Sequence, residues 1–117
     1  IIFNKQTINM ANNYKFKGVA LATSAETALL TAASDETIII RSIRVTNNTS
    51  NTPTISLDLS DSSASAEYTI LKTQTLAANT AVEIIKVSLV LESSDVLKAT
   101  ISSSDSIHFG ISYLVIT

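Results

Sequence analysis

The chain has 117 residues, a formal net charge of −2 and a charged share of 15%, well below the roughly 25% of an average soluble domain. Because it contains no cysteine, one histidine and only two glycines, disulfides, thiolate or multi-histidine metal sites and glycine-rich phosphate loops are excluded. We therefore expect one domain that has neither a basic footprint for nucleic acid nor an apolar run long enough to span a membrane.

The first thirteen residues are predicted to form an extended arm that precedes a folded domain of residues 14–117. The arm has three apolar anchors among polar residues, which are too few to fold alone, so we expect it to dock on a neighbouring subunit. These anchors are Ile1, Phe3 and Ile8. Met10-Ala11 also reads as a processed translational start, which leaves open whether residues 1–9 are native.

The next segment, Tyr14 to Leu21, is a strand candidate in which aromatic and basic side chains alternate. Tyr14 and Phe16 are interleaved with Lys15 and Lys17. This pattern could form a small contact with nucleic acid or another anion, but four residues are too few for a footprint. Lysines are common on edge strands, where they discourage pairing with unrelated chains, so an edge strand or arm is predicted. The candidate assembly contacts are Ile1, Phe3, Ile8, Tyr14 and Phe16.

Two further segments in the first half of the chain predict strands. Thr27 to Thr31 is a short one, although Ser24 to Ala33 also has apolar residues at helical spacing, which leaves a short helix as the alternative. Thr37 to Thr46 is the strongest run of β-forming residues. Its alternation slips between Ile40 and Ile43, which indicates a bulge, a bend or burial on both faces.

The second half of the chain has the clearest alternation of apolar and polar residues. Half-buried strands are predicted at 55–59, 97–101 and 107–115, and further strands at 66–73 and 81–91, the last divided near Lys86. The apolar face of the alternating runs is predicted to form core through Ile55, Leu57, Leu59, Leu97, Ile101, Ile107, Phe109, Ile111 and Val115. Short strands between polar turns predict an all-β fold, a single antiparallel β-sandwich (jelly-roll or Ig-like) of seven to nine strands.

The sequence offers little for catalysis. His108 is the only candidate general base, and Ser106 and Asp105 precede it, but neighbours along one strand point to alternate faces and do not converge as a triad requires. Asp58 and Asp61 lack the ligand number that calcium needs. The six aromatic residues are few for a sugar-binding surface. No catalytic, metal-binding or cofactor-binding residue is predicted, and we expect the chain not to be an enzyme.

Three motifs suggest a family. They are the strand Ile38–Asn47 with its Asn-rich end, the turn Leu76–Thr80, and the segment Leu91–Lys98 that precedes a strand. With the Met-Ala-Asn start, this layout from Met10 to Thr117 resembles a group of short structural proteins of tailed bacteriophages, especially marine ones. The resemblance implies a β-rich virion component without catalytic residues.

The expected function is therefore that of a non-enzymatic virion structural protein, a capsid decoration subunit. It would contact copies of itself, as a trimer by the resemblance, and other virion proteins such as the major capsid protein. Two alternatives are a tail- or fibre-associated host-binding module, and a subunit of an extracellular filament joined by strand addition of the arm. No cofactor, nucleic acid or membrane is expected as a partner.

Overall fold

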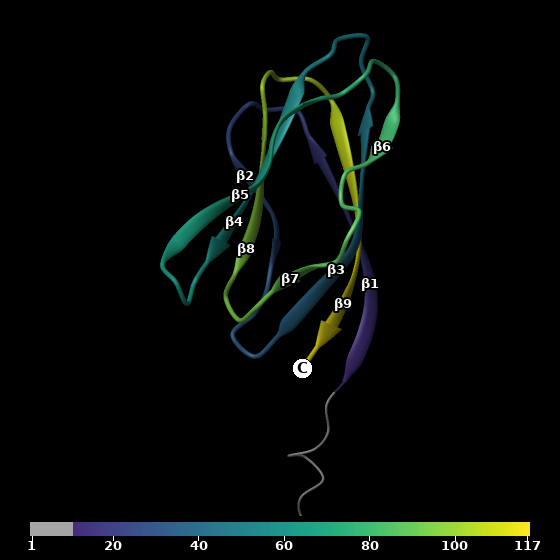
Figure 1. Ribbon diagram of the computed structural model, residues 1–117. Coiled ribbons are helices and arrows are strands. Elements are labelled where there is room, and N and C mark those ends of the chain that lie inside the picture. Colours follow the sequence, from purple (N-terminus) through teal and green to yellow (C-terminus); the bar gives the residue numbers. More distant parts are fainter. Residues whose placement is uncertain (1–10) are drawn as a thin grey trace, which may run out of the picture.

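The computed structural model describes residues 11–117, which form nine strands and no helix. The strands gather in two antiparallel sheets that pack face to face (Figure 1), which confirms the predicted all-β sandwich. The helical alternative for Ser24–Ala33 is wrong. Thr27–Thr31 forms β2, in which a bulge between Ala28 and Leu30 allows the consecutive Leu29 and Leu30 both to be buried.

No helix among the described residues is long and apolar enough to cross a membrane.

In the first sheet, the first strand of the described region lies at one edge and the last strand lies beside it. Its order is β1 (Asn12–Leu21), β9 (Ile107–Ile116), β3 (Thr37–Asn47) and β6 (Ala81–Glu83), with β7 (Leu89–Leu91) also paired to β3. The predicted division of the 81–91 segment is confirmed, because residues 84–88 separate β6 from β7. β1 begins at Asn12, two residues before the expected start of the domain.

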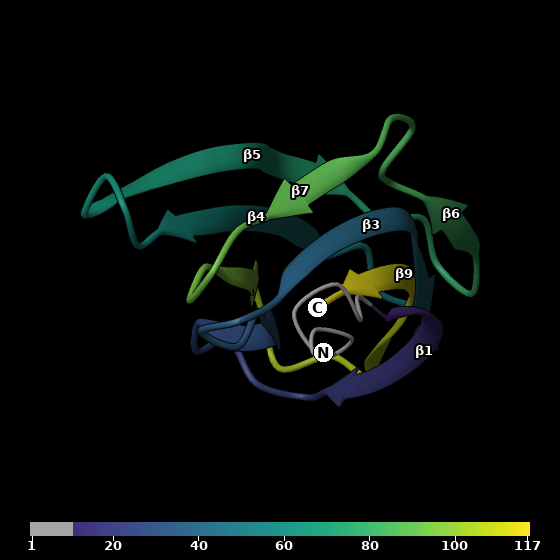
Figure 2. The ribbon, with the colours of Figure 1, turned by 90° about the horizontal axis from the view of Figure 1, so that it is seen from below.

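The second sheet has the order β2 (Thr27–Thr31), β8 (Val96–Ile101), β4 (Thr54–Asp61) and β5 (Ala66–Thr75). Apart from the β4–β5 hairpin and the β6–β7 link, every connection crosses from one sheet to the other. Each sheet has four strand positions across its width, because β6 and β7 both pair with β3. Two such sheets joined by these crossing connections form a jelly roll, so the fold is the jelly-roll type and not the Ig-like type of sandwich. Seen along the strands, β1 and β5 lie on opposite sides of the sandwich (Figure 2).

The core lies between the two sheets and is built mainly from aliphatic side chains. Of the nine predicted core residues, eight are buried, and Leu59 is half-buried and packs against them. Phe109 is the one aromatic ring among the fully enclosed side chains and is 2% exposed. These contacts follow from the period-two alternation, since one face of each strand is apolar.

A bulge explains the broken alternation in β3. The pairing of β3 with β9 shifts between Ile40 and Ser42, so Arg41 is an extra residue in the ladder. The extra residue rotates the strand and brings Ile43 back to the inner face that Ile40 occupies, and both are buried. Glu83 on β6 fastens the bulge, because its carboxylate accepts the Ser42 hydroxyl at 2.7 Å and the Ile43 amide at 2.7 Å.

Two buried polar side chains hold the turns at the ends of the sandwich. Asn47 donates its amide to the carbonyls of Asn51 and Ala77, at 2.8 and 3.2 Å. Asp95 accepts the backbone N–H groups of Ser62 and Glu92, each at 2.9 Å, on its two carboxylate oxygens. Each residue satisfies its own polar atoms while it orders backbone that would otherwise have no partner.

Candidate functional site

The predicted assembly contacts divide into two groups. Ile1, Phe3 and Ile8 lie outside the described residues. Tyr14 and Phe16 lie on β1 with side chains 75% and 69% exposed, although they are among the largest apolar side chains of the chain. Two exposed rings on one face of an edge strand make β1 the first candidate for an interaction surface.

Within the described residues β1 pairs only with β9, so its other edge is free. Beyond the strand ends, Thr117 donates its backbone N–H to the Ala11 carbonyl at 3.1 Å. In an antiparallel ladder, residue pairs that exchange hydrogen bonds alternate with pairs that do not. The register of β1 with β9 has no shift from Asn12 to Leu21, so this alternation continues from the Ala11–Thr117 bond along the whole strand. Odd-numbered residues of β1 therefore bond to β9, and even-numbered amides, including that of Gly18, face the free edge.

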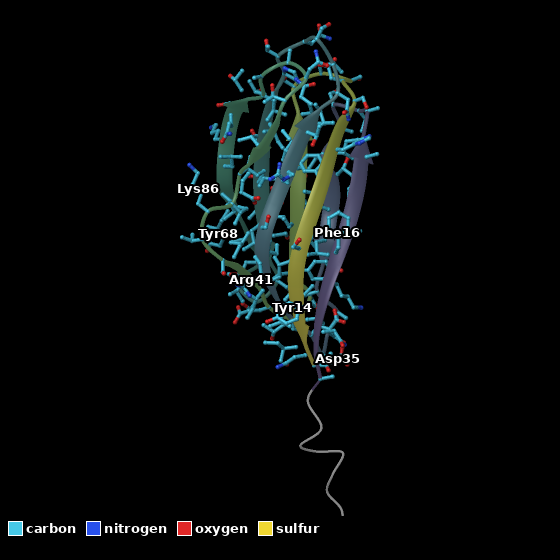
Figure 3. All side chains as sticks on the ribbon, turned by 90° about the vertical axis from the view of Figure 1, so that its right-hand side faces the viewer. Tyr14, Phe16, Asp35, Arg41, Tyr68 and Lys86 are labelled. Atoms are coloured by element: carbon cyan, nitrogen blue, oxygen red, sulfur yellow. The ribbon has the colours of Figure 1, made fainter. Side chains whose placement is uncertain are left out.

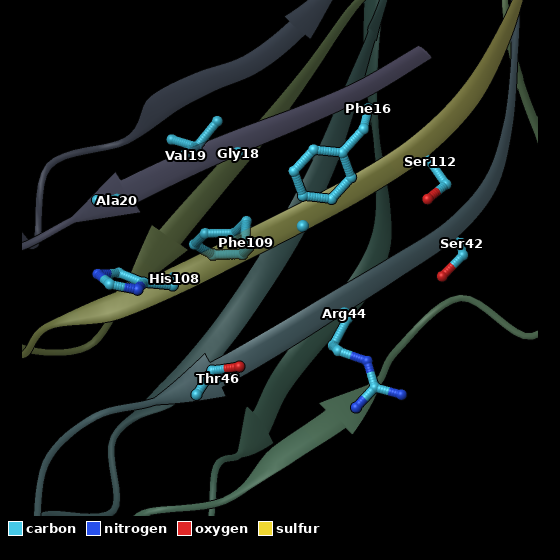
Figure 4. A pocket seen from close by; sticks show the side chains of 11 residues that line it. Phe16, Gly18, Val19, Ala20, Ser42, Arg44, Thr46, His108, Phe109 and Ser112 are labelled. Carbon is cyan, nitrogen blue, oxygen red and sulfur yellow. The ribbon is translucent and has the colours of Figure 1, made fainter. Parts of the chain in front are cut away.

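The outer face of the first sheet carries a trough along β9, between β1 and β3 (Figure 4). Its larger part is a hollow of about 530 Å³, and a neighbouring hollow shares Phe16 and Ser112 with it. The residues that line this trough include Tyr14, Phe16, Gly18, Arg41, Arg44, His108, Gly110 and Ser112. The floor is low because glycine and serine occupy it, and longer side chains form the walls.

The two glycines of the chain lie opposite each other in this floor. Gly18 on β1 is paired with Gly110 on β9, and the Phe16 ring covers both. A Cβ placed on Gly110 would lie 3.1 Å from Phe16 Cε1, and one placed on Gly18 would lie 3.6 Å from Phe16 Cε2. The ring thus lies over both glycines, and a side chain at 110 would displace it slightly from its present position.

Both arginines of the chain belong to the trough. Arg41 on the bulge and Arg44 are exposed, and among the described residues neither forms an ion pair. Lys15 and Lys17 alternate with the aromatic residues of β1 and so project from the opposite face of that strand, although Lys15 also borders the second hollow. In Figure 3, Tyr14, Phe16 and Arg41 lie over this sheet, whereas Tyr68 and Lys86 lie to one side. A chain of net charge −2 therefore presents one locally basic face.

The residues considered for a triad do not share one site. His108 is exposed and lines one end of the trough. Asp105 instead belongs to a loop, where its carboxylate accepts the Asn51 amide at 2.8 Å and the Ser103 hydroxyl at 2.5 Å. The hydroxyl of Ser103, and after it the Asn51 amide, lowers the pKa of Asp105.

Removal of the Ser103 hydroxyl is expected to raise the pKa of Asp105 toward its ordinary value of about 3.9. Because the pKa is lowered in the folded state, ionised Asp105 stabilises the fold above the unfolded pKa, and this is lost as pH falls through the folded pKa. An NMR titration of Ser103→Ala measures the change, with Ser104→Ala as the matched control. An unchanged Asp105 titration in Ser103→Ala would contradict the assignment.

Two groups of carboxylates are close enough to hold a cation. In the first, Lys98 already neutralises the set, with Nζ 3.1 Å from Glu67 and 4.0 Å from Glu26, and the Glu67 carboxylate raises the pKa of Lys98. In the second, Asp61 and Glu92 approach Asp95, whose two oxygens are engaged by backbone amides. The hydrogen bonds of Asp95 account for its burial without a metal ion.

Sequence reasoning missed the trough. It weighed the alternation of aromatic and lysine residues as a small anion contact but preferred an edge strand, and it counted the aromatic residues without placing them. The pairing of Gly18 with Gly110 joins residues far apart in sequence, so only the register of the sheet reveals it. The single available signal was that both arginines stand three residues apart on the strongest strand.

Comparisons with known proteins support the fold. No family model and no curated protein sequence matches the chain. A protein from Bacillus endospore appendages, described as a novel family of disulfide-linked pili, has a similar structure, with a TM-score of 0.53 and 7% identity over 92% of this chain and 86% of that one. The Clostridium thermocellum xylanase 10B CBM22-1–GH10 modules, complexed with xylohexaose, give a TM-score of 0.48 and 16% identity over 92% of this chain, which spans 26% of that one. At 7% identity, the likeness to the pilus protein is one of fold alone.

Proposed function

We propose that this chain is a non-enzymatic structural subunit that works by repeated contacts with copies of itself. The observation that carries the proposal is the free edge of β1, ten residues long, whose first seven residues are exposed. A long unpaired edge offers a row of backbone donors and acceptors to another chain, and natural proteins normally cover such edges.

Strand addition is the contact that this edge suits best. An extended segment of a neighbouring copy would bond to the even-numbered amides of β1 and extend the first sheet by one strand. Residues 1–11 precede β1 in the sequence and include the anchors Ile1, Phe3 and Ile8, so we assign the donated segment to the arm of the neighbour. A contact between two different surfaces is heterologous and builds either a closed ring or an open filament.

A closed ring and an open filament correspond to two different biological assemblies. The resemblance to tailed-bacteriophage proteins supports a closed oligomer, a trimer, that decorates a virion and contacts the major capsid protein. The fold likeness to the protein of disulfide-linked pili supports an extracellular filament, and because this chain has no cysteine its subunit contacts would be non-covalent. Analytical ultracentrifugation and electron microscopy of the purified chain separate a discrete trimer from an open polymer.

Proline substitution at adjacent positions of β1 tests the edge. Gly18→Pro removes an amide that faces the free edge and leaves the bonds to β9 in place, so we expect assembly to weaken and the melting temperature to change little. Lys17→Pro removes a bond to β9 and is expected to destabilise the fold by about 1–3 kcal/mol. Sedimentation measures assembly, and thermal unfolding measures stability.

Deletion of residues 1–9 tests the donated segment. It should remove the donated segment, weaken assembly and leave the far-ultraviolet circular dichroism of the sandwich unchanged. Assembly of unchanged affinity in both Gly18→Pro and the deletion variant would contradict strand addition at β1. Turnover of a defined substrate that is lost in His108→Ala would contradict the non-enzymatic role.

A further inference from the structure

We propose that the trough on the outer face of the first sheet binds an acidic polysaccharide, a polymer of uronic-acid sugars. This goes beyond the proposed assembly role, because strand addition uses the edge of β1, in the plane of the sheet, and the trough lies on the face. The two surfaces can therefore be occupied and tested separately.

The shape of the trough fits an extended ligand. Its volume of about 530 Å³ lies within the range of roughly 300–1,000 Å³ usual for ligand sites. The second hollow continues from Phe16 and Ser112 to Tyr113, so the lined part of β9 reaches from His108 to Tyr113. At a rise of about 3.3 Å per residue this is about 17 Å, more than a single sugar ring spans.

One wall of the trough supplies surfaces for stacking. Tyr14 and Phe16 are two residues apart on β1 and so project from the same face of the sheet. Phe16 is held by Gly18 and Gly110 beneath it and remains 69% exposed above. The exposed face of this ring is apolar, and the C–H face of a pyranose ring packs against such a surface.

The opposite wall selects for carboxylates. Arg41 and Arg44 on β3 are exposed, and no ion pair engages them in the part of the chain that the structure describes. Arginine binds a carboxylate through two parallel hydrogen bonds. Glu83, the cross-strand partner of Arg44, directs its carboxylate to the Ser42 hydroxyl and the Ile43 amide and forms no ion pair with either arginine.

The observations favour an acidic sugar polymer over other anions and over neutral sugars. Neutral sugars do not account for two arginines on one wall that form no ion pair within residues 11–117. Domains that bind nucleic acid usually carry a clear excess of basic residues, whereas this chain has 8 Lys and Arg against 10 Asp and Glu. Polar lining groups such as Ser42, Ser112 and His108 suit the hydroxyls of a sugar.

Isothermal titration calorimetry of the full chain with oligogalacturonate tests the proposal. We expect binding that weakens as salt is added, and no binding of a neutral maltooligosaccharide of equal length. Phe16→Ala and Arg44→Ala should each weaken binding about tenfold or more, because one removes the stacking surface and the other a charged hydrogen bond. Gly110→Ala should also weaken it without a change of charge, since the new Cβ forces the Phe16 ring to move.

Matched controls come from the rest of the surface. Tyr68 is an exposed ring on β5 and Lys86 an exposed cation, both away from the trough, so Tyr68→Ala and Lys86→Ala should bind as the parent does. Circular dichroism confirms that each variant is folded. Equal binding of the neutral oligosaccharide, tighter binding of oligothymidylate, or unchanged binding in Phe16→Ala and Arg44→Ala overturns the proposal. So does a shift of Phe16→Ala to a smaller oligomer without loss of sugar binding, because the face would then be a contact between copies.

Discussion

Replacement of Phe109 by alanine is expected to lower the free energy of unfolding by about 3–5 kcal/mol. The ring lies on β9 at the centre of the first sheet, is 2% exposed and faces the core between the two sheets. Its neighbours come from strands that are hydrogen-bonded in ladders and cannot close around the space. The cost therefore combines lost burial with a residual cavity, and it approaches the whole stability of a small domain.

Urea unfolding followed by circular dichroism measures this loss. Phe16→Ala is the matched control, because the same side chain is removed from the same sheet where it is 69% exposed, and its effect should stay below about 1 kcal/mol. A Phe109→Ala loss as small as that of Phe16→Ala would mean that the inner face of β9 is not core. That result would overturn the packing of the two sheets.

The fold could be predicted from the sequence because its strands are amphipathic at period two. In β8 and β9 one face is apolar at every second position, and most of the buried positions follow from counting. The slip in β3 indicated a bulge, but its position at Arg41 and its fastening by Glu83 depend on pairing with β9 and β6. Register between distant strands is a property that local patterns do not contain.

The trough was beyond sequence reasoning for the same reason. Phe16 and Gly110 are 94 positions apart, and their contact exists only because β1 and β9 pair with Gly18 opposite Gly110. Arg44 joins them from β3 across β9. Each residue by itself has an ordinary interpretation as an edge aromatic, a strand glycine or a surface cation. Only their convergence on one face gives them a common chemistry.

Asp95→Ala is expected to destabilise the fold by about 2–4 kcal/mol, although it removes an acidic side chain from a cluster of carboxylates. Relief of repulsion from Asp61 and Glu92 acts in the opposite direction, but Glu92 is exposed and its charge is largely solvated. The larger effect is the loss of both acceptors for the Ser62 and Glu92 amides, which are partly buried and have no other hydrogen-bond partner in their turns.

Urea unfolding of two further variants shows whether Asp95 stabilises the fold through its hydrogen bonds or is only a repulsive charge. Asp95→Asn keeps one oxygen but turns an amide donor toward one of the two N–H groups, so it should also destabilise, by less than Asp95→Ala. Glu92→Ala removes a neighbouring carboxylate without touching either bond, so urea unfolding should find it neutral or slightly stabilising. If Glu92→Ala and Asp95→Ala shift the unfolding midpoint alike, electrostatic repulsion dominates this turn. If only the Asp95 variants lose stability, its hydrogen bonds hold the β7–β8 turn against the end of β4.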